Sequence, residues 1–167
     1  RYGIFRGQVF RFINRILSES SPNLIVIKEV KNPSQFGVLT NIGEIPQVIE
    51  KPKSYLGNQV VTGLYKFGKD IRDILIEARI SARGETEIAD VLNVLLSNSD
   101  YETSIVRLTR AILWLDAGTF ENLSNTNILI SQICQRQGQD FGCLEEAAYQ
   151  SNLITKSELK FLIKDYP

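Results

Sequence analysis

The chain has 167 residues, of which 43% are hydrophobic and 23% are charged, and its 19 basic and 19 acidic residues balance to no net charge. This length and composition fit about one globular domain with a sizeable core. Because basic and acidic residues balance, the sequence gives no sign of a basic surface for nucleic acid. Because the sequence contains no histidine, Ser-His catalysis and histidine-ligated metal sites are excluded.

The first half of the chain predicts one helix and about four strands. Residues 1–10 are expected to be a strand end that passes into a loop, and the apolar spacing over 11–18 predicts a helix. Short β-branched and apolar runs predict strands at 24–30, from 36–39 onward, up to Glu50, and over 60–67. Asn41, Gly43 and Glu44 predict a hairpin-like turn between the second and third of these strands.

The second half of the chain predicts mainly helices. Apolar residues recur at helical spacing over 69–79, 87–96, 120–137, 144–150 and 157–163, and residues 101–108 alternate like a strand. Thr119 and Gly138 are expected to cap the helix between them, and Thr155 with Glu158 fits a capping box. The order of elements predicts an α/β core sheet over 1–119 and a small C-terminal helical section over 120–167.

One candidate site stands where a predicted strand stops, at Glu50, Lys51 and Pro52. Proline has no N–H for a strand ladder, and the ends of strands in α/β sheets are where ligands bind. A lysine suits a phosphate group, and the neighbouring carboxylate can bond a sugar hydroxyl. Gly63 in the next predicted strand permits close approach of a ligand or of another backbone. Taken alone, such a Glu-Lys pair is more often a solvated strand end.

Three further segments carry candidate chemistry. Gly37, within Phe36-Gly37-Val38, marks either a ligand contact or a β-bulge. Residues 83–87 place carboxylates before a helix, where the helix dipole favours them in any case. Residues 114–118 put a Trp and an Asp at an expected strand end before a small loop, which could hold a divalent ion and a sugar face.

Together these segments resemble the sugar-1-phosphate nucleotidylyltransferase family, and within it the glucose-1-phosphate thymidylyltransferases. The shared strings are FGVL (36–39), EKPK (50–53), VTGLY (61–65), RGETEIA (83–89), WLDAGT (114–119), RQG (136–138) and CLEE (143–146). They follow the family's order over essentially the whole chain. The resemblance implies a Rossmann-like nucleotide-diphospho-sugar transferase fold with a mixed sheet. It also implies the reaction of a sugar 1-phosphate with a nucleoside triphosphate, for example glucose 1-phosphate with dTTP, to give a nucleotide-sugar and pyrophosphate with Mg²⁺.

Carried over position by position, the resemblance implies roles for individual residues. Lys51 would hold the sugar phosphate, and Asp116 would be a magnesium ligand. The implied substrate-binding residues are Gly37, Glu50, Lys51, Val61, Gly63, Glu87 (with Glu85 less favoured) and Trp114. The C-terminal helices resemble the family's section for subunit contacts and a second nucleotide site.

The sequence also departs from the family pattern. The glycine-rich loop GGxGTRLxPxT is absent from the 167 residues, and Tyr2 stands where the family has its other metal-binding Asp. A phenol does not replace a carboxylate on Mg²⁺ at neutral pH. We therefore expect the sugar half of an active site, incomplete as this chain alone. The alternatives are a non-catalytic sugar-phosphate-binding or regulatory relative, and a stable remnant without a ligand.

The sequence also predicts the cellular location of the protein and the partners it binds. Two cysteines, the absence of a long apolar stretch and the absence of a signal-peptide pattern predict a cytoplasmic protein with free thiols and no membrane partner. A sugar 1-phosphate and a nucleotide are the expected small-molecule partners. A partial sheet would expose strand edges and an apolar face. A homo-oligomer, or a second chain that supplies the missing half, is therefore expected.

Overall fold

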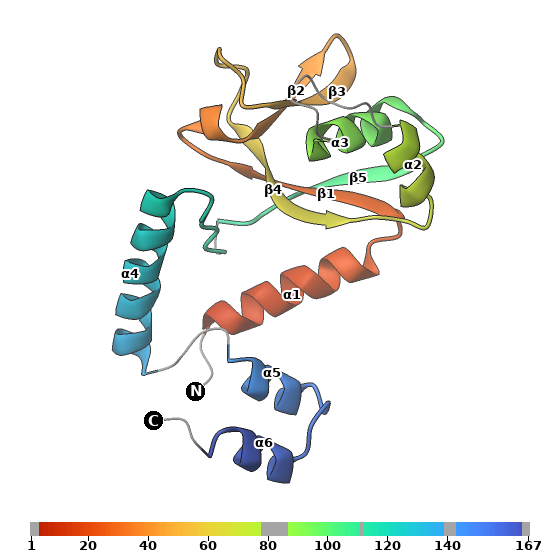
Figure 1. The fold of residues 1–167 in the computed structure, drawn as a ribbon. Coiled ribbons are helices and arrows are strands. Elements are labelled where there is room, and N and C mark those ends of the chain that lie inside the picture. The colour runs from red at the N-terminus through yellow and green to blue at the C-terminus, as the bar shows by residue number, and fades with distance from the viewer. Residues whose placement is uncertain (1–3, 78–86, 111, 139–142, 165–167) are drawn as a thin grey trace. The chain divides into compact units, whose positions relative to one another are not determined.

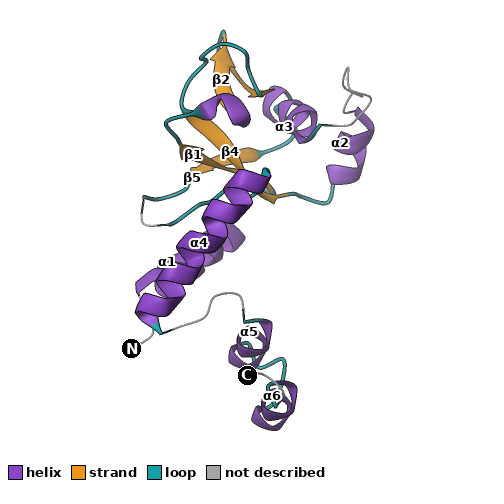
Figure 2. Ribbon diagram, turned by 60° about the vertical axis from the view of Figure 1, so that its left-hand side comes forward, coloured by secondary structure: helices purple, strands orange, loops and turns teal. Residues whose placement is uncertain are grey.

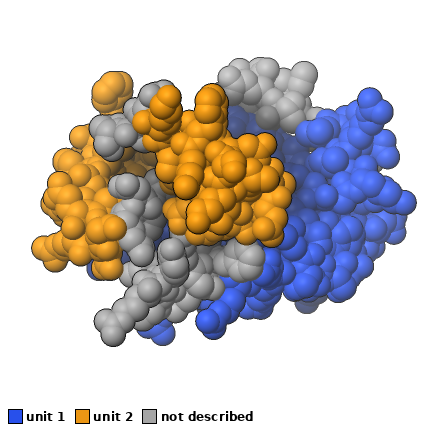
Figure 3. All heavy atoms as spheres, turned by 90° about the horizontal axis from the view of Figure 1, so that it is seen from below, with its two compact units in different colours: residues 1–114 blue, residues 115–167 orange. Residues whose placement is uncertain are grey.

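In the computed structural model of the chain, the structure describes residues 4–77, 87–110, 112–138 and 143–164. The elements in chain order are α1 (Ile4–Ser18), β1 (Asn23–Glu29), η1 (Pro33–Gln35), β2 (Gly37–Ile42), β3 (Ile45–Glu50), β4 (Gln59–Lys66), α2 (Ile71–Glu77), α3 (Ile88–Ser97), β5 (Thr103–Arg107), α4 (Phe120–Gln137), α5 (Leu144–Gln150) and α6 (Lys156–Leu162). The chain packs as two compact units, residues 1–114 and residues 115–167, which Figure 3 colours separately. The predicted α/β class is confirmed, and the division of function at residue 120 stays a prediction.

The first unit is built on one mixed sheet with the strand order β3-β2-β4-β1-β5. β1 pairs antiparallel with β4 and parallel with β5. β2 pairs with β3 along its whole length, from Gly37 opposite Glu50 to Ile42 opposite Ile45, but pairs with β4 only at Val38 and Val60. The β2–β3 hairpin therefore rises out of the layer that β1, β4 and β5 form (Figures 1 and 2).

The sheet buries side chains on both of its faces, because successive residues of a strand point to opposite sides. α1 covers one face and α2 with α3 cover the other (Figure 1). The α1 face is built from Phe12, Ile16, Leu24, Val26, Val106 and Leu108. The opposite face is built from Ile25, Ile27, Val48, Val61, Ile74, Ala89, Val91, Leu92 and Leu95. β1, which lies between β4 and β5, contributes buried side chains to both cores.

The prediction for the N-terminal segment is wrong. Residues 1–10 were expected to end a strand, but α1 begins at Ile4 and continues to Ser18. The cause is present in the sequence, because apolar residues at positions 4, 5, 9, 12, 13, 16 and 17 recur at helical spacing along the whole segment. Tyr2 lies outside the described residues.

The other predicted helices and strands are confirmed with small differences at their ends, apart from positions 78–79 of the helix predicted over 69–79, which lie outside the described residues. α4 begins after Thr119, whose side chain accepts a hydrogen bond from the Asn122 N–H at 3.1 Å, and ends at Gly138 with φ 58°. The capping box of Thr155 and Glu158 is present. No helix in the described part of the chain is long and apolar enough to cross a bilayer.

One further expectation is wrong, namely that Trp114 and Asp116 stand at a strand end. β5 ends at Arg107, and no strand is found over residues 112–118. The chain leaves the sheet at a turn in which the Ile112 N–H donates to the Thr109 carbonyl at 3.2 Å. Ile112 and Trp114 then pack against the α1-side core as part of an irregular segment.

Candidate functional site

The candidate site begins at the open end of the β2–β3 hairpin. Gly37 and Glu50 form the last residue pair of the ladder, and the next hydrogen bond runs from the Lys51 N–H to the Phe36 carbonyl at 3.0 Å. Glu50 and Lys51 therefore stand where the strand stops, and Pro52 follows outside the ladder, as the sequence predicted. The hairpin register is what brings the FGVL and EKPK segments together.

Gly37 allows several predicted site residues to meet. A Cβ atom at this position would lie 2.9 Å from Val61 Cγ2, 3.0 Å from Glu50 Oε2 and 3.0 Å from Val48 Cγ1. Such distances are shorter than ordinary van der Waals contact, so a larger residue would displace the Glu50 carboxylate or the valines. The absence of a side chain at Gly37 therefore sets where Glu50 and Val61 lie.

Lys51 combines an unusual backbone conformation with an accessible charge. Its φ of 44° lies in the left-handed region, which L-residues other than glycine rarely adopt. Its Nζ lies 3.9 Å from Glu50 Oε1, and the two side chains are 53% and 24% exposed. This long ion pair leaves the ammonium group open to an incoming anion.

An aromatic pair forms a wall beside this strand end. The rings of Phe36 and Trp114 lie 5.2 Å apart between centroids and are tilted by 56°. Trp114 Nε1 donates a hydrogen bond to the Thr62 carbonyl at 3.1 Å, which ties the irregular segment after β5 to β4. Trp114 is among the predicted substrate-binding residues, and that role stays a prediction. Its partner Phe36 was not selected, although it directly precedes Gly37 in the FGVL string.

Tyr65 is a further residue that sequence reasoning missed. Burial raises the pKa of its phenol, the negative charge of Glu50 raises it further, and a hydrogen bond with the Gly63 backbone acts in the opposite direction. Gly63 has φ 80°, and the pairing of β1 with β4 shifts register between Ile25 and Ile27. Gly63 and Glu50 thus both act on the Tyr65 phenol. The only sequence signal was the final position of Tyr65 in the VTGLY string.

Glu87 lies at the start of a helix that is fixed to the hairpin. It is the N-cap residue of α3. Asn93 of the same helix holds the outer edge of β3, because its side chain accepts from the Val48 N–H at 2.7 Å and donates to the Val48 carbonyl at 2.9 Å. A contact between Glu87 and a bound sugar stays a prediction, and Glu85 lies outside the described residues.

Asp116 belongs to the second compact unit and is described with it. Its Oδ1 accepts from the Gly118 N–H at 3.2 Å, and its Oδ2 accepts from Asn122 Nδ2 at 2.8 Å. These bonds hold the carboxylate at the beginning of α4 and leave a lone pair on each oxygen. The predicted convergence of Asp116 with Glu50 and Lys51 stays a prediction.

The fit of this chain to Mg²⁺ depends on that one carboxylate. Within the described residues, no group of three or more acidic, cysteine or histidine side chains could hold a metal ion. Mg²⁺ is commonly bound through one or two carboxylates, with substrate phosphates and water as the other ligands. Asp116 therefore fits an ion that a substrate completes, and does not fit an all-protein cage.

Comparison with known proteins identifies what the chain resembles. Residues 8–132 match the family model described as nucleotidyl transferase. The chain is 34% identical over 138 residues to the glucose-1-phosphate thymidylyltransferase of Mycolicibacterium smegmatis, covering 81% of this chain and 47% of that protein. It is 29% identical over 165 residues to the enzyme of the same name from Neisseria meningitidis, covering 96% of this chain and 56% of that protein. The chain thus spans about half the length of these relatives.

Solved structures agree in fold. A Bacillus anthracis protein assigned as a glucose-1-phosphate thymidylyltransferase, solved in complex with sucrose, superposes with a TM-score of 0.58 at 26% identity, covering 72% of this chain and 48% of that one. An apo UDP-glucose pyrophosphorylase superposes with a TM-score of 0.53 at 21% identity, covering 75% of this chain and 47% of that one. The second similarity supports the fold alone.

Proposed function

Because the chain belongs to the nucleotidyl transferase family, we propose that its strand-end site binds a sugar 1-phosphate for nucleotidyl transfer. The substrates would be a sugar 1-phosphate, with glucose 1-phosphate first among candidates, and a nucleoside triphosphate, with dTTP first. The names of the Mycolicibacterium and Neisseria relatives support this choice. The products would be a nucleotide-sugar and pyrophosphate.

One observation carries the proposal, namely the meeting of Gly37, Glu50 and Lys51 at the open end of one hairpin. The exposed Lys51 ammonium would pair with the sugar phosphate as a point charge. The Glu50 carboxylate would accept hydrogen bonds from sugar hydroxyls. Val61 and the Phe36–Trp114 pair would provide apolar surface for the sugar ring.

The chemistry asked of these residues is positioning and charge neutralisation. A phosphate oxygen of the sugar 1-phosphate would attack the α-phosphorus of the triphosphate, the bond from the α-phosphorus to the bridging oxygen would break, and pyrophosphate would leave. Holding the phosphate at Lys51 would orient that oxygen and offset its charge. Asp116 would hold Mg²⁺, which when bound neutralises phosphate charge.

We further propose that turnover requires residues that these 167 do not supply, from a longer form of the polypeptide or from a second chain. The missing glycine-rich string supports this proposal, as does the half-length match to the relatives. A cytoplasmic protein that binds sugar phosphate without catalysis is the second candidate. Tyr2, in place of the family's metal-binding Asp, favours it.

Calorimetric titration with glucose 1-phosphate tests the site directly. We expect saturable binding to the 167-residue chain and at least about a tenfold loss in Lys51→Ala, because a charge-assisted hydrogen bond contributes about 1.5–3 kcal/mol. Lys69→Ala, which changes an exposed lysine outside the site, is the matched control and should bind like the parent chain. Equal affinity in Lys51→Ala would remove Lys51 from the site.

Pyrophosphate release separates the two candidate functions. With glucose 1-phosphate, dTTP and Mg²⁺, we expect no release from these 167 residues alone. Release should appear when a polypeptide carrying the glycine-rich loop is added, if the chain is part of an enzyme. Binding without release in that mixture would favour the non-catalytic candidate. Release from the 167 residues alone would contradict the proposal that they are incomplete.

A further inference from the structure

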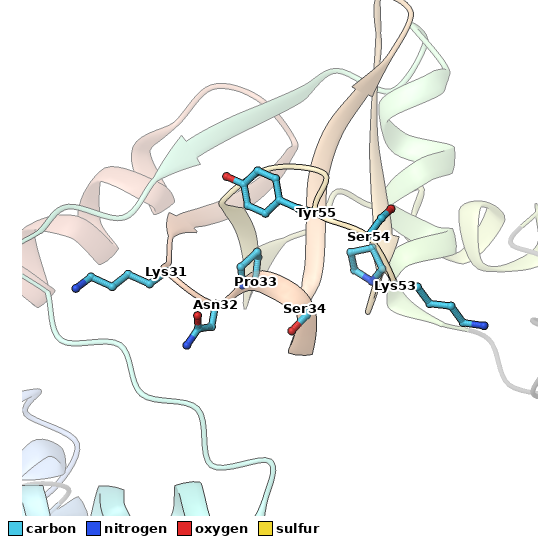
Figure 4. A pocket seen from close by; sticks show the side chains of 8 residues that line it. Lys31, Asn32, Pro33, Ser34, Lys53, Ser54 and Tyr55 are labelled. Carbon is cyan, nitrogen blue, oxygen red and sulfur yellow. The ribbon is translucent and has the colours of Figure 1, made fainter.

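A second recess lies beyond the hairpin end, where the chain segments that flank β2 and β3 separate (Figure 4). It has a volume of about 320 Å³ and is lined by Lys31, Asn32, Pro33, Ser34, Pro52, Lys53, Ser54 and Tyr55. Of these residues, only Pro52 was named with the sugar site, where it ends the strand and contacts no substrate group. The volume lies near the lower end of the range for small-molecule sites, about 300–1,000 Å³.

The recess is positively charged, although the whole chain is neutral. Its lining includes Lys31 and Lys53 and no acidic residue. Both lysines are exposed, and neither forms an ion pair with a carboxylate in the described part of the chain. Two unneutralised ammonium groups at one recess favour an anionic ligand.

The remaining lining residues add neutral donors and a flat apolar surface. Asn32, Ser34 and Ser54 provide amide and hydroxyl groups, which suit the oxygens of a phosphate. The Tyr55 side chain is 74% exposed, and Figure 4 shows its ring beside Pro33. An aromatic face that remains open to solvent is available for stacking with a planar ring.

The two lysines lie on opposite sides of the recess. Figure 4 shows their side chains extending away from each other, with Pro33 and Tyr55 between them. Lysine carries its charge on a flexible four-carbon stem, so either ammonium group can turn toward a ligand that lies between them. The arrangement thus provides cations at both rims and an aromatic surface in the middle.

We propose that this recess binds a small ligand that combines a phosphate group with a planar ring. The phosphate lies between Lys31 and Lys53 with the hydroxyls of Ser34 and Ser54, and the ring lies against Tyr55. The proposal does not depend on the sugar site, because the lysines, serines and tyrosine that carry it have no role there.

The test is a titration of the whole ¹⁵N-labelled 167-residue chain by NMR, with phenyl phosphate and inorganic phosphate as probes. We expect both probes to shift the backbone amides of Ser34, Ser54 and Tyr55. In the double variant K31Q/K53Q, the binding affinity for both probes should fall by roughly tenfold or more. Tyr55→Ala should weaken the binding of phenyl phosphate and leave the binding of inorganic phosphate unchanged.

The control double variant K69Q/K156Q removes two exposed lysines outside the recess and should bind both probes like the parent chain. Equal binding in K31Q/K53Q, or no shift at the three amides, would overturn the proposal. Shifts confined to Gly37 and Glu50 that disappear in Lys51→Ala would also overturn it, since the probes would then occupy the sugar site. Retention of glucose 1-phosphate binding in K31Q/K53Q keeps the two sites distinguishable.

Discussion

At the scale of single residues, Lys51 is where the backbone and the proposed chemistry conflict. A left-handed conformation costs a residue with a Cβ about 1–2 kcal/mol, yet a lysine with φ 44° occupies this position. Strain of this kind persists where the surrounding structure holds it and is concentrated at functional sites. The observed conformation is therefore consistent with selection of this lysine for its charge, at a position where glycine would fit the backbone better.

Replacing Lys51 by glycine and by alanine separates the effect of its backbone strain from the effect of its charge. Both variants lose the ammonium group, so both should lose sugar-phosphate affinity. Lys51→Gly should have a free energy of unfolding about 1 kcal/mol higher than Lys51→Ala, because only alanine retains the left-handed strain. Urea denaturation measures the difference. Lys53 has no positive φ, so Lys53→Gly should be no more stable than Lys53→Ala, and the opposite order there would invalidate the comparison.

The raised pKa of the Tyr65 phenol predicts that the stability of the fold depends on pH. Burial raises the pKa of its phenol above the ordinary 10.0, and Glu50 adds to the effect. The folded state then holds this proton more tightly than the unfolded state. The stability linked to Tyr65 is therefore complete below pH 10 and falls as the pH rises through the folded pKa. Tyr65→Phe should lose less stability than the parent chain between pH 9 and pH 11, measured by urea denaturation at each pH.

Glu50→Gln tests the cause of that shift. Without the neighbouring negative charge, part of the increase in the Tyr65 pKa should disappear, so the alkaline loss of stability should be smaller and should end at lower pH, with its onset unchanged. Parallel stability curves for the parent chain, Tyr65→Phe and Glu50→Gln above pH 9 would show that Tyr65 is not the titrating group.

The residues of the site differ in how far the sequence could predict them. Glu50 and Lys51 were identifiable because Pro52 marks the end of a strand. The register that places Gly37 opposite Glu50 follows from the short turn of the hairpin. The hydrogen bond of Tyr65 with the Gly63 backbone lies in the stretch of β4 where the pairing with β1 shifts register, and no spacing rule indicates that shift.

At the scale of elements, the attachment of α3 to the edge strand β3 sets the geometry around Glu50. Val48 is opposite Leu39 in the ladder, and its N–H and C=O both bond to the side chain of Asn93. One amide group thus replaces a neighbouring strand at this point and closes an edge that could otherwise pair with another chain. The contact joins residues 45 positions apart, so no local sequence pattern predicted it.

Asn93→Ala should therefore destabilise the fold. The substitution leaves the Val48 N–H and C=O without their partner, and an unsatisfied polar group costs about 1–3 kcal/mol. Chemical denaturation of the variant measures this loss. Asn127→Ala, at an exposed position of α4, is the matched control and should be neutral or slightly stabilising, because alanine favours helix. A similarly small effect at Asn93 would show that the edge contact does not contribute to stability.

The helices show where local sequence rules are sufficient. α4 and α6 carry their own boundary signals in Thr119, Gly138 and the Thr155–Glu158 box, and the structure places the helix ends there. The first ten residues lacked such a signal and were assigned from their resemblance to a strand end, although their apolar spacing is helical. In this segment the apolar spacing predicts the structure correctly, whereas the assignment as a strand end does not.

At the scale of the whole molecule, the described helices of the second unit leave their apolar side chains unburied. No residue of α4, α5 or α6 is buried. The large exposed apolar side chains of this unit are Leu115, Phe120, Leu123, Ile128, Leu144, Tyr149, Leu153, Phe161, Leu162 and Ile163. An apolar surface of this kind is typical of an interaction face.

We therefore predict that the chain self-associates through the helices of residues 144–163. Size-exclusion chromatography with light scattering should give a mass above that of one chain at micromolar concentration. The double variant L153S/F161S should shift the midpoint of dissociation to at least tenfold higher protein concentration, because each apolar side chain contributes about 1.5–3 kcal/mol when buried. Ile76→Ser changes an equally exposed apolar side chain of α2 in the first unit and should leave the midpoint unchanged. A single-chain mass at every concentration would contradict self-association. An equal shift in Ile76→Ser and L153S/F161S would show that the contact is not specific to the C-terminal helices, since loss of any exposed apolar side chain would then have the same effect.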